Sequence, residues 1–193
     1  MSAAVPDGFV EELWHRAQIE DAMRRYCRGL DRCDWDLLRS AYHPDAHDDH
    51  GTYKGDVDGL IAWAAERHAH IEQSIHLLGN CTIDRAGDVA IVETYCIAHL
   101  RFDPAAAAAS AMYADGSTGA LVAATWWLRY IDRFERRDEW RVADRVVVLE
   151  HVQTAAAEAA LADEVWVQSR RDPDDLLWSR RRDLSPTPGA SPG

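Results

Sequence analysis

The hydrophobic positions of the chain change their spacing along its length. Over residues 8–30 they recur every three or four residues, as Ile19, Met23 and Tyr26 do. This period predicts a long amphipathic helix that carries Tyr26 on its buried face. A second, short helix is expected directly after it, with Asp34 as its N-cap.

A third helix is expected after Gly55, because several side chains of the following segment fall on one side of a helix. These side chains are Val57, Leu60, Ile61, Ala64 and His68. The stretch between the second and third helices, residues 42–51, is strongly polar. It predicts a turn and a short strand.

From His76, where we expect a strand to begin, the pattern alternates with period two. Residues 89–102 place Val92 and Cys96 on one face and Glu93 and Tyr95 on the other. Two further strands are expected over residues 121–135 and 140–152, joined by a tight polar turn. Helices followed by long antiparallel strands predict an α+β fold. We expect a cone-shaped barrel, in which a curved, mostly antiparallel sheet wraps around the N-terminal helices and encloses an apolar pocket.

The remaining segments carry weaker patterns. The alanine-rich residues 103–119 predict a long loop or an irregular hairpin connection, and residues 155–163 predict one more helix. We expect a single domain over residues 1–184, with a core at about 9–152 and a C-terminal helical extension at 153–184. The Pro/Gly/Ser-rich residues 185–193 predict a disordered tail.

Composition narrows the class of protein. The chain has 193 residues, 47% of them hydrophobic, and a formal net charge of −12. Such an acidic balance argues against nucleic acid and anionic membranes as partners. No secretory signal or membrane-spanning run is visible, and the four cysteines form no CxxC pair. We therefore expect a cytoplasmic protein with reduced thiols.

Asp31 and His76 are the residues from which we expect catalysis. An imidazole can take a proton near neutral pH, and a carboxylate behind it fixes its tautomer and stabilises its cation. Each residue also has a structural interpretation. Asp31 could be a solvated turn residue paired with Arg28 or Arg32, and His76 could be a core histidine bonded to a backbone carbonyl.

Arg145 lies on the last strand, where neither face is cleanly apolar. If its face lines the pocket, Arg145 needs an acidic or oxyanionic partner; otherwise it is an exposed charge paired with Asp144 or Glu93. Tyr26 points inward, where its hydroxyl could protonate or orient a departing oxygen or simply pack. Alternate positions of one strand are expected mainly to pack in the core, and their share in function would be an aromatic wall that selects a bulky apolar substrate. These positions are Trp126, Leu128, Tyr130 and Phe134.

Three histidines among aspartates raise the question of a metal site. His43, His47 and His50 alternate with Asp45, Asp48 and Asp49. Their spacing fits no defined ligand signature, so we predict no metal and no cofactor. Instead, His50 is expected to reach inward and to bind substrate together with Tyr42 and Tyr53.

Several motifs occur in an order that resembles the SnoaL-like division of the nuclear transport factor 2-like superfamily. The resemblance extends over about Leu13 to Val152 and is strongest to relatives of the scytalone dehydratase, lindane dehydrochlorinase and bile-acid 7α-dehydratase type. The motifs are Tyr26-x4-Asp31, His-Pro-Asp-Ala-x3-His-Gly at 43–51, Gly51-Thr-Tyr-Lys-Gly55, Ser74-Ile-His76, and Phe134-Glu-Arg-Arg-Asp with Trp140 and Arg145.

The resemblance implies a cone-shaped fold, a homo-oligomer (a trimer more than a dimer), and cofactor-independent elimination of water or HCl in secondary metabolism. Asp31 and His76 take the place of the family's general base, and Tyr26 and Arg145 take the places of its pocket tyrosine and arginine. The implied lyase acts on a small hydrophobic, cyclic substrate. An isomerase or polyketide cyclase with the same Asp–His pair, and a non-catalytic binding module, stay open because fold alone does not name a reaction.

Overall fold

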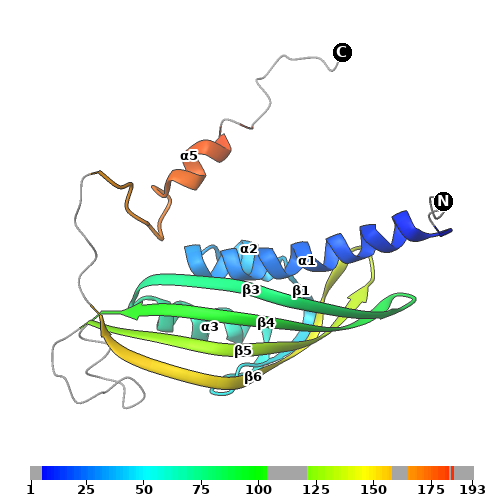
Figure 1. Cartoon of the computed structure of the whole chain (residues 1–193), viewed down its shortest axis with the longest axis horizontal. Helices are drawn as coiled ribbons and strands as arrows, with labels where there is room; N and C mark the ends of the chain where they lie inside the picture. Colours follow the sequence, from blue (N-terminus) through cyan, green and yellow to red (C-terminus); the bar gives the residue numbers. More distant parts are fainter. Residues whose placement is uncertain (1–5, 104–120, 158–164, 183, 185–193) are drawn as a thin grey trace, which may run out of the picture.

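The computed structural model describes residues 6–103, 121–157, 165–182 and 184, and its fold is α+β (Figure 1). Helices come first in the chain and long strands follow. In chain order the elements are α1 (Phe9–Arg32), α2 (Trp35–Arg39), β1 (Tyr42–Asp49), β2 (Lys54–Asp56), α3 (Val57–His68), β3 (Ile71–Ala86), β4 (Val89–Phe102), β5 (Leu121–Arg136), β6 (Trp140–Ala157) and α5 (Leu176–Arg182).

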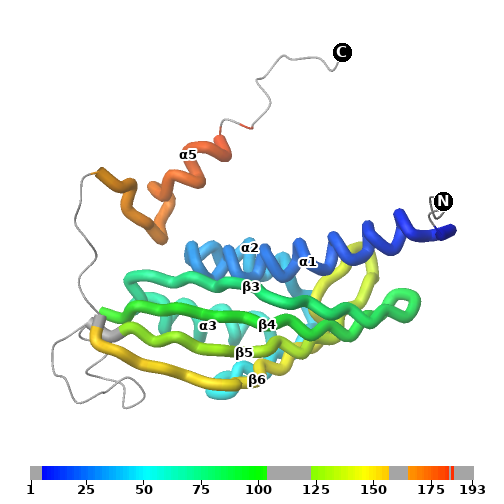
Figure 2. Tube along the Cα trace, in the orientation of Figure 1, coloured from blue at the N-terminus to red at the C-terminus, as the bar shows by residue number. Residues whose placement is uncertain are grey.

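All six strands form one curved sheet in the order β2-β1-β6-β5-β4-β3. The pairing is antiparallel except between β1 and β6, which run parallel. The helices α1 and α3 lie along the concave side of this sheet (Figure 2). The predicted cone-shaped arrangement of a curved, mostly antiparallel sheet around N-terminal helices is confirmed.

The helix predictions are confirmed in their main features. The side chain of Asp34 accepts a hydrogen bond of 3.0 Å from the backbone of Leu37, as an N-cap residue should. Gly29 lets α2 pack closely on α1, because a Cβ atom built there would lie 2.7 Å from the Cβ atom of Leu38. This contact fixes the chain direction directly after the end of α1 that carries Asp31.

An extra residue in β6, the last strand, explains why apolar and charged side chains occur on both of its faces in the sequence pattern. Phe134 pairs with Val142 and Arg133 pairs with Asp144, so Ala143 has no partner across the strands. Such a β-bulge reverses the side-chain alternation. As a result both Val142 and Arg145 point into the core and are fully buried.

Three sequence predictions need correction. The strand β3 begins at Ile71, so His76 lies within the strand and not at its start. Residues 155–157 continue β6 instead of beginning a helix, because they pair in register with residues 121–123. In the described part of the C-terminal extension, only Leu176–Arg182 is helical. The predicted loop at 103–119, the rest of the helix predicted at 155–163 and the tail at 185–193 lie almost wholly outside the described residues.

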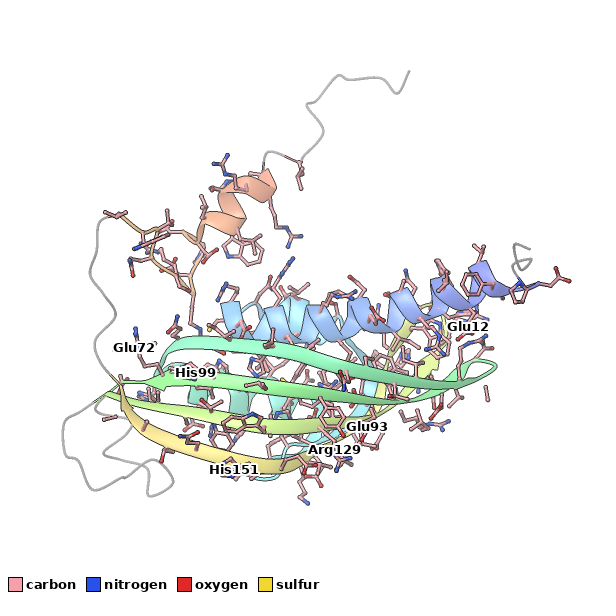
Figure 3. The ribbon with its side chains drawn as sticks, viewed as in Figure 1. Glu12, Glu72, Glu93, His99, Arg129 and His151 are labelled. Atoms are coloured by element: carbon pink, nitrogen blue, oxygen red, sulfur yellow. The ribbon has the colours of Figure 1, made fainter. Side chains whose placement is uncertain are left out.

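The convex side of the sheet faces away from both helices. Glu93 and Arg129 lie together on this side of β4 and β5 (Figure 3) and form an ion pair of 2.7 Å. Apolar side chains stand in a row beside them, since Leu77 pairs with Ile97 and Ile97 pairs with Trp127. Leu77 and Ile97 are exposed.

Candidate functional site

Asp31 and His76 meet in the structure. Asp31 lies in the last turn of α1, and His76 lies on the concave side of β3. The Nδ1 atom of His76 is 2.7 Å from Oδ1 of Asp31. The same carboxylate accepts a hydrogen bond of 2.7 Å from the Ser74 hydroxyl and one of 2.9 Å from the backbone N–H of His76. Both carboxylate oxygens are therefore held by the strand that carries the histidine.

These hydrogen bonds keep Asp31 ionised in a buried setting. Burial by itself raises the pKa of Asp31, but the hydrogen bonds from His76 and Ser74 outweigh burial and lower the pKa from 3.8 to about 2. An ionised carboxylate accepts hydrogen bonds and cannot donate them. The Nδ1 atom of His76 must therefore carry the proton, which leaves Nε2 free to accept one.

His76 opens onto a cavity of about 250 Å³ enclosed by the sheet, α1 and α3. Most of its wall is aliphatic or aromatic, which suits a small apolar molecule. Among the described residues the lining comprises Leu30, His50, Gly51, Thr52, Trp63, Arg67, His68, His76, Ala98, Leu100, Trp126, Leu128, Tyr130, Val147 and Leu149. No acidic side chain occurs in this set.

A second, larger space of about 770 Å³ lies on the other side of the Asp31–His76 pair, between α1 and β3. Its walls carry the charged side chains of Glu20, Arg24 and Arg28. Charged walls of this kind hold water better than they hold an apolar molecule. We therefore assign the smaller cavity as the place for an organic ligand.

A second Asp–His pair lies at the same cavity, which its histidine lines. His50, in the loop after β1, has its Nδ1 atom 2.8 Å from Oδ1 of Asp48, and its Nε2 atom 3.3 Å from the Tyr26 hydroxyl. Asp48 is fully buried and accepts a hydrogen bond of 2.7 Å from Tyr42. Burial raises the pKa of Asp48, but the bond from His50 and neighbouring charges outweigh it and lower the pKa. Burial raises the pKa of Tyr26 well above its ordinary value, so its hydroxyl is neutral.

Arg145 lies behind the Asp48–His50 pair and binds the residues around it. Two of its nitrogens each donate to an oxygen of Asp132 at 2.7 Å, and a third donates to Tyr42 at 3.0 Å. Its guanidinium lies between the rings of Tyr26 and Tyr130, 4.2 and 4.5 Å from their centroids. Burial opposes the charge of Arg145, but Asp132 outweighs this effect and raises the pKa further. Arg145 thus stays a cation inside the core.

The predicted site residues fall into two groups. His50, His76, Trp126, Leu128 and Tyr130 line the cavity. The others do not reach its surface among the described lining residues. Asp31 lies beside His76 and lines the larger space. Tyr26, Tyr42 and Arg145 lie behind His50, and Tyr53 hydrogen-bonds the Asp56 carbonyl while it stacks on Trp63. Arg145 is neither the exposed charge nor the partner of Asp144 or Glu93 considered above, because its carboxylate is Asp132.

The histidines of residues 43–50 do not converge. The ring of His43 bonds to the Glu135 carbonyl at 2.8 Å, and His47 is exposed beside Asp144. Only His50 of the three faces the cavity. Within the described ranges, no group of three or more histidine, cysteine or acidic side chains could hold a metal ion.

Some residues of the site carry no signal in the sequence. Asp132 stands among aromatic positions of β5 and resembles a surface residue until its pairing with Arg145 is known. Arg171, far along the chain, donates to the backbone carbonyls of Leu30 and Asp31 at 3.0 and 2.9 Å. The motif Ser74-Ile-His76 does contain a usable signal, because residues two apart on a strand share a face.

Known proteins are similar to this chain in sequence pattern and in fold. The model of the SnoaL-like domain matches residues 11–146. A search among curated protein sequences found no match. In the chain regions described, no helix is long and apolar enough to cross a membrane.

Solved structures share the fold at low sequence identity. A type 2 hexachlorocyclohexane dehydrochlorinase has a TM-score of 0.65 at 17% identity, over 80% of this chain and 99% of that one. A candidate scytalone dehydratase from Novosphingobium aromaticivorans has a TM-score of 0.60 at 16% identity, over 77% and 93%. The Kfla4162 protein from Kribbella flavida has a TM-score of 0.62 at 15% identity, over 74% and 95%.

Proposed function

Because the chain belongs to the SnoaL-like domain family, we propose that it is a cofactor-independent lyase that eliminates water or a halide from a small hydrophobic, cyclic substrate. The observation that carries the proposal is the 2.7 Å contact between His76 Nδ1 and the Asp31 carboxylate at the wall of an apolar cavity. A relative of the same fold is named as a dehydrochlorinase and another as a candidate scytalone dehydratase, which supports this reaction class.

The proposed reaction begins with proton transfer. His76 Nε2 removes a proton from the carbon next to an activating or leaving group, and Asp31 stabilises the imidazolium that forms. The C–H electron pair becomes the new double bond as the leaving group departs. The apolar wall of Trp126, Leu128 and Tyr130 excludes water and so strengthens these charge interactions.

Tyr26 and Arg145 are proposed to act through their neighbours and not by touching substrate. Their side chains are buried behind His50, where Arg145 holds Tyr42 and Asp132, and Tyr26 contacts the His50 ring. We propose that Tyr42 belongs to the same supporting layer, and that Tyr53 holds Trp63 at the cavity wall. His50, Trp126, Leu128 and Tyr130 are the proposed substrate contacts.

We also propose that the protein works as a homo-oligomer, a trimer more than a dimer, in the cytoplasm and in secondary metabolism. The exposed apolar row on the convex side of the sheet supports self-association. All four cysteines are free thiols, which supports a reducing compartment.

The test uses β-hydroxy ketones, whose elimination gives an enone with strong ultraviolet absorbance. A panel of 3-hydroxycyclohexanone and larger fused-ring β-hydroxy ketones, together with hexachlorocyclohexane, is offered to the full chain. We expect turnover of at least one compound, and His76→Gln should lower it by ~100-fold or more. His47→Gln, in an exposed histidine beside Asp144, is the matched control and should keep full activity.

The alternatives give different products. An isomerase or cyclase with the same base returns the proton, so the product keeps the mass of the substrate, whereas elimination loses water or halide. A non-catalytic binding module forms no product even in the wild type, and it retains ligand binding after His76→Gln. Unchanged turnover in His76→Gln rules out the assigned base.

A further inference from the structure

We propose that His68 donates a hydrogen bond from Nε2 to a carbonyl oxygen of the substrate, so that the site takes a small cyclic ketone with its leaving group on the β-carbon. The inference rests on the proposed elimination and deepens it, because it names the activating group of the substrate and the side chain that binds it. His68 is the last residue of α3 and lines the same cavity as His76.

The position of the proton on His68 is set by Arg171. The Arg171 guanidinium donates to Nδ1 of His68 at 2.5 Å. A guanidinium has only donors, so Nδ1 accepts and the single ring proton lies on Nε2. Burial and the charge of Arg171 lower the pKa of His68 from 6.5 to about 3, so the ring is neutral near pH 7. His68 is therefore a fixed N–H donor and not a base.

The Nε2 atom of His68 faces the cavity. Arg171 occupies the Nδ1 edge of the ring, and Trp35 of α2 packs edge-on against it with centroids 6.0 Å apart. Among the described residues the structure shows no acceptor for Nε2, and Nε2 is not one of their fully buried polar atoms without a partner. It therefore reaches open space, and the space that His68 lines is the cavity.

The charges around His68 favour an oxygen that gains negative charge. Four charged or titratable groups act on its ring: Arg171 of the C-terminal segment, Arg67 of α3, Asp31 of α1 and His76 of β3. Arg67 is itself part of the cavity wall. The two guanidinium groups outnumber the one carboxylate. The end of the cavity at the last turn of α3 thus stabilises an oxyanion.

Arg171 also removes an unfavourable effect of the helix end. The C-terminal end of a helix is negative and by itself disfavours an oxyanion nearby. The Arg171 guanidinium donates to the carbonyls of His68 and Ile71 at 3.4 and 2.5 Å. One cation therefore compensates the end of α3 and fixes the ring that donates, which makes Arg171 a positioning residue.

The proposed step balances in atoms and electrons. His76 Nε2 takes the proton from carbon 2, the C–H pair forms the C1=C2 bond, and the carbonyl π pair moves onto oxygen. His68 Nε2–H binds this oxyanion and keeps its own proton. The carbonyl then re-forms, the C1=C2 pair moves to C2=C3, and the C3–O bond breaks. The departing oxygen takes the proton from His76 and leaves as water, so both imidazoles end as they began.

Two substitutions separate the donor from the partner of Arg171. In His68→Asn the amide oxygen takes the place of Nδ1 and still accepts from Arg171, but no group lies at the position of Nε2. In His68→Gln the amide nitrogen reaches the position of Nε2, and the acceptor for Arg171 is lost. From 3-hydroxycyclohexanone we expect enone formation to fall ~100-fold in His68→Asn and less than ~10-fold in His68→Gln.

His70→Asn is the matched control for these variants. His70 is an exposed histidine just after α3, beside Asp103, and its variant should keep full activity. Equal losses in His68→Asn and His68→Gln would show that His68 serves only to hold Arg171, which overturns the proposal.

A bound ketone reports the hydrogen bond without turnover. A hydrogen bond to a carbonyl lowers its stretching frequency, which infrared difference spectra of cyclohex-2-enone labelled with ¹³C at the carbonyl can measure. We expect the bound band at lower frequency in wild type and His68→Gln than in His68→Asn. A band that His68→Asn leaves unmoved overturns the proposal. A band that moves in Arg67→Met instead also overturns it and assigns the oxygen to Arg67.

Cyclohexanone, which has no leaving group, tests the oxyanion apart from elimination. In D₂O the exchange of its α-hydrogens needs the base and the oxygen donor only. We expect wild type to catalyse this exchange and His68→Asn to lower it by ~100-fold. Exchange without any turnover of β-hydroxy ketones contradicts only the elimination proposed above. Turnover that His68→Asn leaves unchanged contradicts only the role of His68.

Discussion

At the scale of single residues, the site depends on buried carboxylates whose oxygens accept hydrogen bonds. Asp31 accepts hydrogen bonds from Ser74 and twice from His76, and Asp132 accepts two from Arg145. A buried charge without such partners costs several kcal/mol. The removal of one partner therefore has consequences for folding as well as for chemistry.

Asp31 should contribute to stability in a defined range of pH. Its pKa is lowered from 3.8 to about 2 in the folded chain, so its contribution is complete above about pH 3.8 and is lost as the pH falls toward 2. Nearly two pKa units correspond to about 2 kcal/mol. Asp31→Asn should therefore show a shallower loss of unfolding free energy over this range, measured by urea denaturation. A slope equal to that of wild type would contradict the bonded carboxylate.

Replacement of Arg145 should destabilise the whole fold. Arg145→Met leaves Asp132 buried without its cation, which should lower the unfolding free energy by ~3–5 kcal/mol. The double variant with Asp132→Asn removes both charges and should recover part of this loss. Chemical denaturation of the two variants measures the difference, and equal stability would argue against the ion pair as the main cause.

At the scale of elements, the C-terminal segment 165–182 lies near the end of α1 (Figure 1). Hydrogen bonds from the Arg171 side chain attach it there. The guanidinium donates to the carbonyls of Leu30 and Asp31 in the last turn of α1, where carbonyls lack the partner four residues later that they have inside a helix. It also donates to His68 Nδ1 at 2.5 Å, so His68 must be neutral. The segment thereby reaches the element that carries Asp31.

Arg171→Met should release this segment. We expect faster proteolytic cleavage within residues 165–182 and a lower turnover, because the end of α1 loses the group that holds its carbonyls. Arg170→Met is a matched control, since Arg170 pairs only with aspartates of its own exposed segment in the part of the chain described. Equal cleavage rates in the two variants would show that Arg171 does not attach the segment.

Acid should weaken the same attachment. The pKa of His68 is about 3 in the folded chain and 6.5 in its ordinary state, so the unfolded chain binds the proton first as the pH falls below 6.5. The unfolding free energy should therefore decrease between pH 6.5 and 3. His68→Gln should show less of this decrease, and an identical pH dependence would contradict a neutral, bonded His68.

Periodicity and motif order predicted the helices α1, α2 and α3, the strands β4 and β5, and the candidate pair Asp31 and His76. These features follow from local spacing, which the sequence displays directly. Both faces of β6 mix apolar and charged residues, so the sequence does not show which face lines the pocket. The reason is the bulge at Ala143, which becomes visible only once β5 and β6 are paired. Asp132 and Arg171 were missed for a similar reason, since their partners lie 13 or more residues away along the chain.

At the scale of the whole molecule, the two sides of the sheet have different surfaces. The concave side is covered by helices, whereas the convex side carries the row of Leu77, Ile97 and Trp127, in which Leu77 and Ile97 are exposed and Trp127 is half-buried. Apolar side chains in such a row are well placed for contact with a second copy of the chain. The net charge of −12 makes copies of the chain repel one another, which disfavours association through their other surfaces.

Ile97→Glu should therefore shift the protein toward the monomer. We expect a lower molar mass by light scattering at a given concentration, because a carboxylate in an apolar contact is costly to bury. Val10→Glu, at an exposed position of α1, is the control and should leave the mass unchanged. A monomeric wild-type protein would contradict the proposed oligomer itself.

The indole rings of Trp63 and Trp126 line the cavity. Their emission responds to whatever molecule displaces solvent beside them, so the protein carries its own optical reporter of occupancy. Libraries of unlabelled compounds can be ranked by quenching before any product is sought. A compound that quenches wild type but not the double variant Trp63→Phe/Trp126→Phe identifies itself as a cavity ligand, and thereby narrows the chemistry to be tried.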